Sequence, residues 1–342
     1  MTRSYNRRMH FPLLALVVTF AVTAVAGGAT AHAASVRGEI ITLLSPNSAG
    51  GMMTRYARMI APYIARHAGA RDVRVRIMTG GGGIRGANAL WYAEPDGRTI
   101  AFTSVTTLIL SQLAGSEAVR FDATRFVYLG RAATEPRVLT VGAGSGIMSV
   151  DDARALGRPF VFPSQGTDED FYSMAVLADV LDIPLKVISG YDGNADTALA
   201  VIRGDGDGHI TGWSASQAVI EAGDEVPILT LGQERFPAWP AVPTALEVVD
   251  GASRNAVQAI VNMLDMRRGF FGPPGLDSEA TAELRAAIGA ALKDPQLVAE
   301  SVAQGLPLQP SPGEAEQIKI EQITEASQHL VPMLRAALES IR

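Results

Sequence analysis

The sequence predicts an α/β protein of two lobes, each a mostly parallel sheet flanked by helices, from three observations. Strand-like and helix-like segments alternate through most of the chain, these segments form two consecutive series, and the chain is long enough for two ordinary domains. Such alternation is typical of mostly parallel sheets with right-handed crossovers, flanked by helices. Single cores stop growing near about 250–300 residues, so a chain of this length favours two lobes with a ligand between them.

The first series reads as strand, helix, strand, helix, strand. We expect strands at 39–44, 73–78 and 99–103 and helices at 52–67 and 84–93. The second series repeats this alternation, with strands at 137–141, 159–162, 185–188, 208–211 and 227–231 and helices at 170–181 and 195–203. Hydrophobic runs bounded by Gly, Pro, Asn and Asp carry these assignments.

The C-terminal part is predicted to be helical. Asp277 and Asp294 read as N-cap residues, the second followed by Pro295 at the first helical position. Residues 311–314 have the spacing of a capping box before the last long helix, which Pro332 is expected to kink. The segment at 251–268 has no role that the sequence assigns.

An exported protein is indicated by the first 33 residues. A basic start is followed by an apolar run broken by Gly27 and Gly28 and by Ala31-His32-Ala33, which together read as a cleaved signal peptide. Cleavage removes three of the 29 basic residues and none of the 35 acidic ones, which leaves a net charge of −9. We therefore expect a periplasmic protein that binds no nucleic acid.

Cysteine is absent from the chain. This excludes a thiol nucleophile, a cysteine-ligated zinc site and disulfides, so stability must come from the core.

A glycine-rich stretch at 80–86, GGGGIRG, follows a predicted strand and precedes a predicted helix. Its G-x-G-x-x-G spacing is that of a dinucleotide fingerprint, but no acidic residue occurs between Asp96 and Glu117 to hold a ribose. No cofactor is therefore expected. The glycines still allow backbone N–H groups to face an anion.

The turn at 45–54, SPNSAGGMMT, raises the same question. It lacks the Gly-Lys-Ser/Thr of a phosphate loop, and no base is identifiable for Ser45 or Ser48. What it offers is a row of backbone donors from about Asn47 to Met53 at a helix start.

Histidine gives no support for catalysis or for a metal site. Only His67, His209 and His329 follow the predicted leader, and they are scattered. Asp205 and Asp207 precede His209, but the twelfth position of an EF-hand loop would be Ser216 rather than Glu. We expect no catalytic residue and no metal ligand. Tyr191 and Trp213, near the ends of second-lobe strands, are candidates for ligand contact.

The order of these segments resembles the Bug-type solute receptors of tripartite tricarboxylate transporters over nearly the whole mature chain. The resemblance is carried by SAGGMMTRYAR, GGGGIRGANALWYAEPDGRTIAF, FDATRFVYLGRA, FVFPSQGT, GYDGNADTAL, FPAWPAVPTALEV and FGPPGL. The resemblance implies a two-lobed periplasmic-binding-protein (Venus flytrap, type II) fold, no catalysis, a small organic acid as ligand and a membrane permease as partner. We expect a monomer with lobe 1 at 34–136 and 265–342, and lobe 2 at 137–264.

The resemblance also implies where the ligand lies. The family's Pro-Gly-Gly turn falls on Ala49-Gly50-Gly51, its following Asp on Thr54, and its Tyr-Lys-Gly on Tyr191-Asp192-Gly193. These departures leave open an aliphatic dicarboxylate, an aromatic acid or another acid, and Met52 and Met53 favour a less polar one. The predicted ligand-binding residues are Asn47, Ser48, Gly50, Gly51, Met52, Met53, Gly82, Gly83, Ser104, Ser164, Gln165, Gly166, Thr167, Tyr191, Thr211 and Trp213.

Two other functions stay open at the level of sequence. One is an extracytoplasmic sensor subunit for a signalling kinase, which uses the same binding fold. The other is an exported serine hydrolase using Ser48 or Ser164, for which a base is missing.

Overall fold

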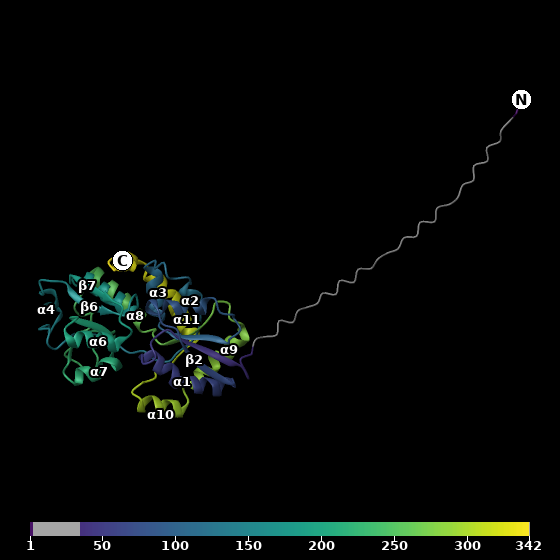
Figure 1. Ribbon diagram of the computed structural model, residues 1–342, viewed down its shortest axis with the longest axis horizontal. Coiled ribbons are helices and arrows are strands. Elements are labelled where there is room, and N and C mark those ends of the chain that lie inside the picture. Colours follow the sequence, from purple (N-terminus) through teal and green to yellow (C-terminus); the bar gives the residue numbers. More distant parts are fainter. Residues whose placement is uncertain (3–34, 342) are drawn as a thin grey trace. The chain divides into compact units, whose positions relative to one another are not determined.

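The computed structural model describes residues 1–2 and 35–341 (Figure 1). The predicted signal peptide lies outside these residues, apart from its first two. None of the helices in the described part of the chain combines the length and apolar character that a membrane crossing requires.

The first sheet has six strands in the order β11-β4-β10-β3-β1-β2. β1 runs parallel to both β2 and β3, whereas β10 is antiparallel to β3 and β4, and β11 is antiparallel to β4. The bounds are β1 Ile40–Ser45, β2 Asp72–Ile77, β3 Thr99–Thr103, β4 Val127–Arg131, β10 Gly269–Gly272 and β11 Ser311–Pro312.

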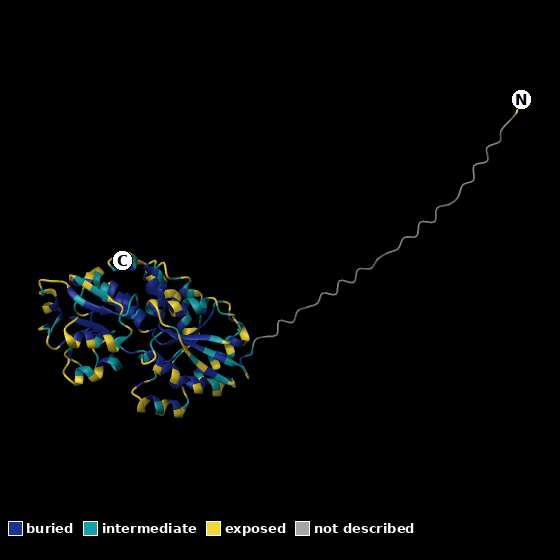
Figure 2. Cartoon of the chain, viewed as in Figure 1, coloured by how far each residue is buried: buried dark blue, intermediate teal, exposed yellow. Residues whose placement is uncertain are grey.

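Alternate side chains of this sheet enter two different cores. Ile41 and Phe102 face α1 (Met52–Ala68) and α9 (Ser278–Ala291), while Leu44 and Ala101 face α2 (Ile84–Trp91) and α3 (Val105–Leu113). This is the period of two that a strand imposes on its side chains. Figure 2 shows the result, with buried strands between helices that are exposed on their outer faces.

The second set of strands forms a three-stranded antiparallel sheet, in the order β8-β5-β9, and a parallel pair, β6 and β7. The strands are β5 Arg137–Gly142, β6 Phe160–Ser164, β7 Leu185–Ser189, β8 Gly208–Gly212 and β9 Glu225–Leu231. The helices are α4 Val150–Arg154, α5 Glu169–Val180, α6 Asn194–Arg203, α7 Trp213–Glu221 and α8 Gly251–Leu264.

The six-stranded sheet is mixed and the three-stranded sheet is antiparallel, rather than mostly parallel, and in each of them one strand runs opposite to the two strands beside it. β3 and β4 run in the same direction, but β10 is inserted between them in the opposite one. β8 and β9 likewise run in the same direction, with the antiparallel β5 between them. The alternation of strands and helices predicts that successive strands run in the same direction. It does not predict that a strand distant in the sequence will lie between two of them.

Two short connections join the sheets, residues 132–136 between β4 and β5 and residues 265–268 between α8 and β10. The predicted lobe boundaries fall in these connections, and the division into lobes stays a prediction. α8 lies in the segment that the sequence left without a role, and its buried residues Ala256, Val257 and Ile260 belong to the core.

The C-terminal helices are α10 (Pro295–Ala303), α11 (Gly313–Ala326) and α12 (Val331–Glu339). The N-caps at Asp277 and Asp294 are confirmed, since both side chains accept backbone N–H bonds. The capping box is wrong, because Ser311 and Pro312 pair with β4 and α11 has no side-chain cap. Pro332 begins α12 rather than kinking a longer helix, since α11 ends at Ala326.

Candidate functional site

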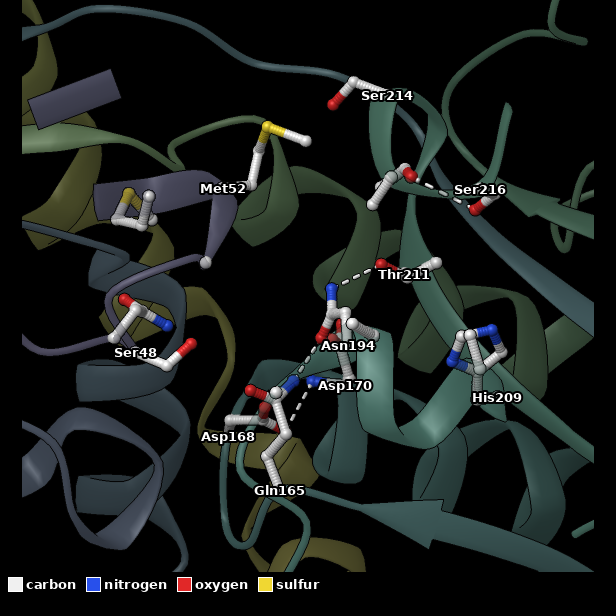
Figure 3. Close-up of a pocket in the computed structure, with 18 of the residues that line it drawn as sticks. Ser48, Met52, Gln165, Asp168, Asp170, Asn194, His209, Thr211, Ser214 and Ser216 are labelled. Carbon is white, nitrogen blue, oxygen red and sulfur yellow. Dashed lines mark hydrogen bonds between the residues drawn. The ribbon is translucent and has the colours of Figure 1, made fainter. Parts of the chain in front are cut away.

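A cavity of about 710 Å³, called the pocket below, is lined by loops and helix starts from both sheets (Figure 3). The first sheet contributes the turn before α1 and the end of β3. The second contributes the starts of α5, α6 and α7, and the connections between the sheets contribute Glu135, Arg267 and Arg268.

Three of the helices that begin at the pocket have open N-termini. α1, α3 and α6 have Gly51, Ser104 and Gly193 as N-caps, and no described side chain bonds to any of the three helix starts. The first turn of a helix has N–H groups without intrahelical partners and a partial positive charge. In this part of the protein those groups face a cavity, so the pocket has the electrostatic character of an anion site.

At two further helix starts in the pocket, a carboxylate side chain of the protein accepts the backbone N–H groups. Asp168 accepts the N–H groups of Asp170 and Phe171 at the start of α5. Glu135 accepts the N–H of Ser214, 3.0 Å away, at the start of α7. At these two helix starts, carboxylates of the chain itself accept the N–H groups that an anionic ligand would accept at the open ones.

The open starts of α1 and α6 face each other. A Cβ placed on Gly193 would lie 3.3 Å from Oγ of Ser48, and one on Gly51 would lie 3.1 Å from the same atom. The N–H of Gly51 closes a turn by donating to the carbonyl of Ser48 at 3.0 Å, so this group is not free to bind a ligand. Glycine at both positions keeps the space between the two helix starts clear.

A chain of side-chain hydrogen bonds forms one wall of the pocket. Nε2 of Gln165 donates to Oδ1 of Asn194, and Nδ2 of Asn194 donates to Oγ1 of Thr211 (Figure 3). The chain links the loop after β6, the start of α6 and the end of β8. It fixes the first residue of α6 relative to the sheet, and therefore the direction of its open N–H groups.

Buried ion pairs make the floor of the pocket. Arg137 pairs with Asp170, Arg268 pairs with Glu135, and Nη2 of Arg267 lies 2.8 Å from Oε1 of Glu169. Each of these residues is less than a tenth exposed. Arg268 also lies over the ring of Tyr56, 4.5 Å from its centroid. The Arg268–Glu135 pair joins the two connections to each other, Arg267–Glu169 joins the connection 265–268 to α5, and Arg137–Asp170 joins β5 to α5.

The carboxyl groups of the floor differ in pKa. Burial and the neighbouring charge of Glu169 raise the pKa of Asp168 to about 7. Burial also opposes the charge of Glu169, but the guanidinium groups of Arg267 and Arg137 outweigh it and lower its pKa to about 2. The pKa of Glu135 is lowered to about 2 in the same way, with Arg268 offsetting the burial. The pocket thus carries ionised pairs and one carboxyl group that titrates near neutral pH.

Ten of the predicted ligand-binding residues line the pocket: Asn47, Ser48, Gly50, Gly51, Met52, Met53, Gly82, Ser104, Gln165 and Thr211. Oγ of Ser104 is buried and has no hydrogen-bond partner among the described residues. Met52 is half-buried and points from the start of α1 into the pocket (Figure 3).

Six predicted residues lie outside the lining: Gly83, Ser164, Gly166, Thr167, Tyr191 and Trp213. Ser164 closes its own loop by exchanging hydrogen bonds with Gly166. Tyr191 lines a separate depression of about 360 Å³. Trp213 packs against Phe236 and Trp239, with ring centroids 4.8 and 4.3 Å away. Gly83 is buried below Pro46.

The sequence reasoning missed the charged floor and the start of α6. The missed residues are Glu135, Arg137, Asp168, Glu169, Asp170, Asn194, Arg267 and Arg268. A partial signal was present, because the three acidic residues at 168–170 lie shortly after the predicted strand at 159–162. Pairing between segments so distant in the chain is not readable from one sequence.

No described histidine is placed to activate a serine of the pocket. His67 contacts Asp294, and His329 bonds to the carbonyl of Ala326. His209 lies between Thr197 and Glu225, 2.8 and 3.1 Å away, and is buried. Asp207 accepts from Arg158 and from the N–H of Val161, and no cluster of metal-ligating side chains occurs in the described chain.

The chain is similar to known proteins in sequence and in fold. The sequence model of the family described as tripartite tricarboxylate transporter family receptor matches residues 57–333. None of the curated proteins compared with the sequence matches it.

Several solved structures have a similar fold. The periplasmic binding protein BugD has a TM-score of 0.71 at 18% identity and covers 86% of this chain and 97% of its own. MatC (Rpa3494) from Rhodopseudomonas palustris, with bound malate, has a TM-score of 0.68 at 18% identity, and the match covers 84% of this chain and 99% of MatC. Rpa4515 of the same organism, with adipate, has a TM-score of 0.68 at 19% identity and covers 86% and 97%.

Proposed function

We propose that this chain, which belongs to the family of tripartite tricarboxylate transporter receptors, captures a small organic acid in the pocket and delivers it to a membrane permease. The family is one of solute-binding receptors and not of enzymes. The observation that carries the proposal is the convergence of the open N-termini of α1, α3 and α6 on one cavity. Relatives with bound malate and adipate support an acid as the ligand.

A carboxylate bound beside Ser48 and Gly193, at the starts of α1 and α6, would satisfy donors from both sides. The N–H groups of Met52 and Met53 belong to the α1 side, and those of Asn194 and Ala195 to the α6 side. Hydrogen bonds to a charged acceptor are about twice as strong as neutral ones. Burial of the charge is tolerable under these conditions because each carboxylate oxygen is hydrogen-bonded and faces two helix dipoles.

Closure of the two lobes follows from this two-sided grip. A carboxylate that contacts α1 and α6 together binds the closed arrangement better than an open one, and so shifts the population toward closed. We place the receptor in the periplasm as a monomer, with lobe 1 at 34–136 and 265–342 and lobe 2 at 137–264. The closed form is then the one that docks on the permease.

A single substitution tests the grip. Gly193→Val places a branched side chain against Oγ of Ser48, and the extended φ of −176° at this glycine allows any residue without strain. We expect calorimetric binding of malate, adipate and octanoate to fall at least about a hundredfold, as for a lost pair of charge-assisted hydrogen bonds.

Gly144→Val is the matched control, since a Cβ at Gly144 has nothing within 4 Å and the residue is not part of the pocket. It should bind as the wild type does. Unchanged affinity of Gly193→Val for an acid that binds the wild type would contradict the proposed grip, and absence of binding by any of the three acids would count against acid capture itself.

A further inference from the structure

An apolar groove continues the pocket along α6 and α7. On α6 the apolar lining residues Ala195, Ala198, Leu199 and Ile202 have the spacing i, i+3, i+4, i+7, which places them on one face of the helix. On α7 the apolar lining residues Ala215, Ala218 and Val219 repeat the first part of this spacing. Polar residues also line the pocket near the starts of these helices: Asn194, Asp196, Ser214 and Ser216. Two apolar helix faces thus border one cavity.

These faces are not core faces. The core side of α6 is made by Thr197, Ala200 and Val201, which are buried. Leu199 and Ile202, by contrast, are 45% and 39% exposed. α6 therefore has two apolar sides, one packed on the sheet and one turned toward the pocket, and only the first is needed to hold the helix in place.

The polar and apolar parts of the pocket are arranged in sequence along α6. Its open N–H groups are at Asn194 and Ala195, and the apolar face begins at Ala195 and runs to Ile202, about 10 Å at the helical rise per residue. Met52 points into the pocket from the opposite wall (Figure 3). A ligand gripped by its carboxylate at the start of α6 would therefore have the rest of its length along the apolar face.

We propose that the ligand is a monocarboxylic acid with an apolar tail of about 10 Å, a medium-chain or aryl-substituted alkanoic acid, whose tail lies between α6 and α7. This inference rests on the proposed capture of an acid and specifies its class. A dicarboxylate of the same length would place its second charge against the apolar side chains of Leu199 and Ile202, at a desolvation cost that an apolar end does not have. The groove thus discriminates by the far end of the ligand, and the helix starts bind the near end.

Octanoate and suberate test the proposal as a matched pair, since they have the same number of carbon atoms and differ in the second carboxylate. Calorimetry on the full mature chain should give octanoate at least about tenfold tighter than suberate. Leu199→Gln and Ile202→Gln should each weaken octanoate about tenfold, because each removes apolar surface buried by the tail.

Val302→Gln is the control variant, because Val302 of α10 is 74% exposed and is not part of the pocket lining. Val302→Gln should leave octanoate binding unchanged. Leu199 and Ile202 are exposed, so both α6 variants should fold, and melting temperatures close to that of the wild type would verify this. The proposed groove would be contradicted if suberate bound as tightly as octanoate. It would also be contradicted if neither Leu199→Gln nor Ile202→Gln changed the affinity for octanoate. If malate, adipate, suberate and octanoate all fail to bind, acid capture fails together with it; if only octanoate fails, the groove alone is wrong.

Discussion

Asp168 is the residue at which the electrostatics of the pocket are most finely balanced. It caps α5, lies next to Glu169, and is less than a tenth exposed. Arg137 and Arg267 pair with Asp170 and Glu169 rather than with Asp168. Their positive charges lower the pKa of Asp168 by less than burial and the charge of Glu169 raise it. A proton is therefore held here at pH values where a carboxyl group in water has lost it.

The stability of the protein should report this proton. The pKa of Asp168 is raised from 3.8 to about 7, so between these pH values the folded state binds a proton that the unfolded state has released. The associated stabilisation is complete below about pH 4 and is lost as the pH rises through about 7. Asp168→Asn keeps an N-cap and removes the titration. We expect its melting temperature, relative to the wild type, to increase steadily from pH 5 to pH 8.

Asp277→Asn is the control variant. It makes the same replacement of an Asp N-cap by Asn, at the half-buried start of α9. Glu135 and Glu169 act outside this window, since their lowered pKa values remove stability only as the pH falls from about 4.5 toward 2. A difference between Asp168→Asn and the wild type that is flat from pH 5 to 8 would refute the raised pKa.

At the scale of elements, the glycine-rich loop at 80–83 has a role that differs from the one its motif suggests. Gly82 lies against the backbone of the loop after β6, where an added Cβ would meet the N of Asp168 and the carbonyl carbon of Thr167, both at 2.9 Å. The loops of the two sheets are therefore in close backbone contact beside the pocket. Glycine is required here by the positive φ of 63° and by this approach.

Alanine substitutions separate these two requirements. Gly81 has a similar φ of 59°, but its added Cβ meets only Ile84 at 3.7 Å. The left-handed conformation alone costs about 1–2 kcal/mol, so we expect Gly81→Ala to lower the melting temperature by about 2–4 °C. Gly82→Ala must also displace the Thr167–Asp168 backbone and should lower it at least twice as far in a thermal melt. Equal shifts for the two variants would mean that the loops are not in contact.

The sequence predicted elements well where a local signal exists. The helix from Met52, the strand at 99–103 and the N-caps at Asp277 and Asp294 are as expected. α3, α7 and β10 were not predicted, because their short apolar runs have no clear caps or turns of their own. The insertion of β5 and β10 into the sheets depends on contacts between distant segments, which periodicity does not contain.

The candidate site divides in the same way. Ser48, Gly51 and Met52 were predicted from a turn whose composition favours an open helix start. Tyr191 and Trp213 were predicted from the positions of strand ends, and they lie outside the pocket because the direction of a side chain depends on its neighbours. Glu135 and Arg268 were missed since charged residues in connections usually face solvent.

For the whole molecule, the buried ion pairs and the pocket form one system. The connections between the sheets carry Glu135, Arg267 and Arg268, so the residues that line the pocket floor are also those about which the sheets would move. Breaking a buried pair by removing one partner is far more costly than breaking a surface pair. The buried Arg268–Glu135 pair therefore links the two connections at the pocket floor, while the open helix starts of α1 and α6 border the pocket from either side.

The central claim is that the pocket recognises a carboxylate through the N-termini of α1 and α6. Calorimetry of octanoate against octanamide, and of adipate against adipamide, tests it most directly, because each pair differs in charge at the head while the carbon chain is the same. Saturable binding of at least one acid, with its amide at least about a hundredfold weaker, is the predicted result. Amides that bind as tightly as their acids would contradict the claim, whatever the tail contributes.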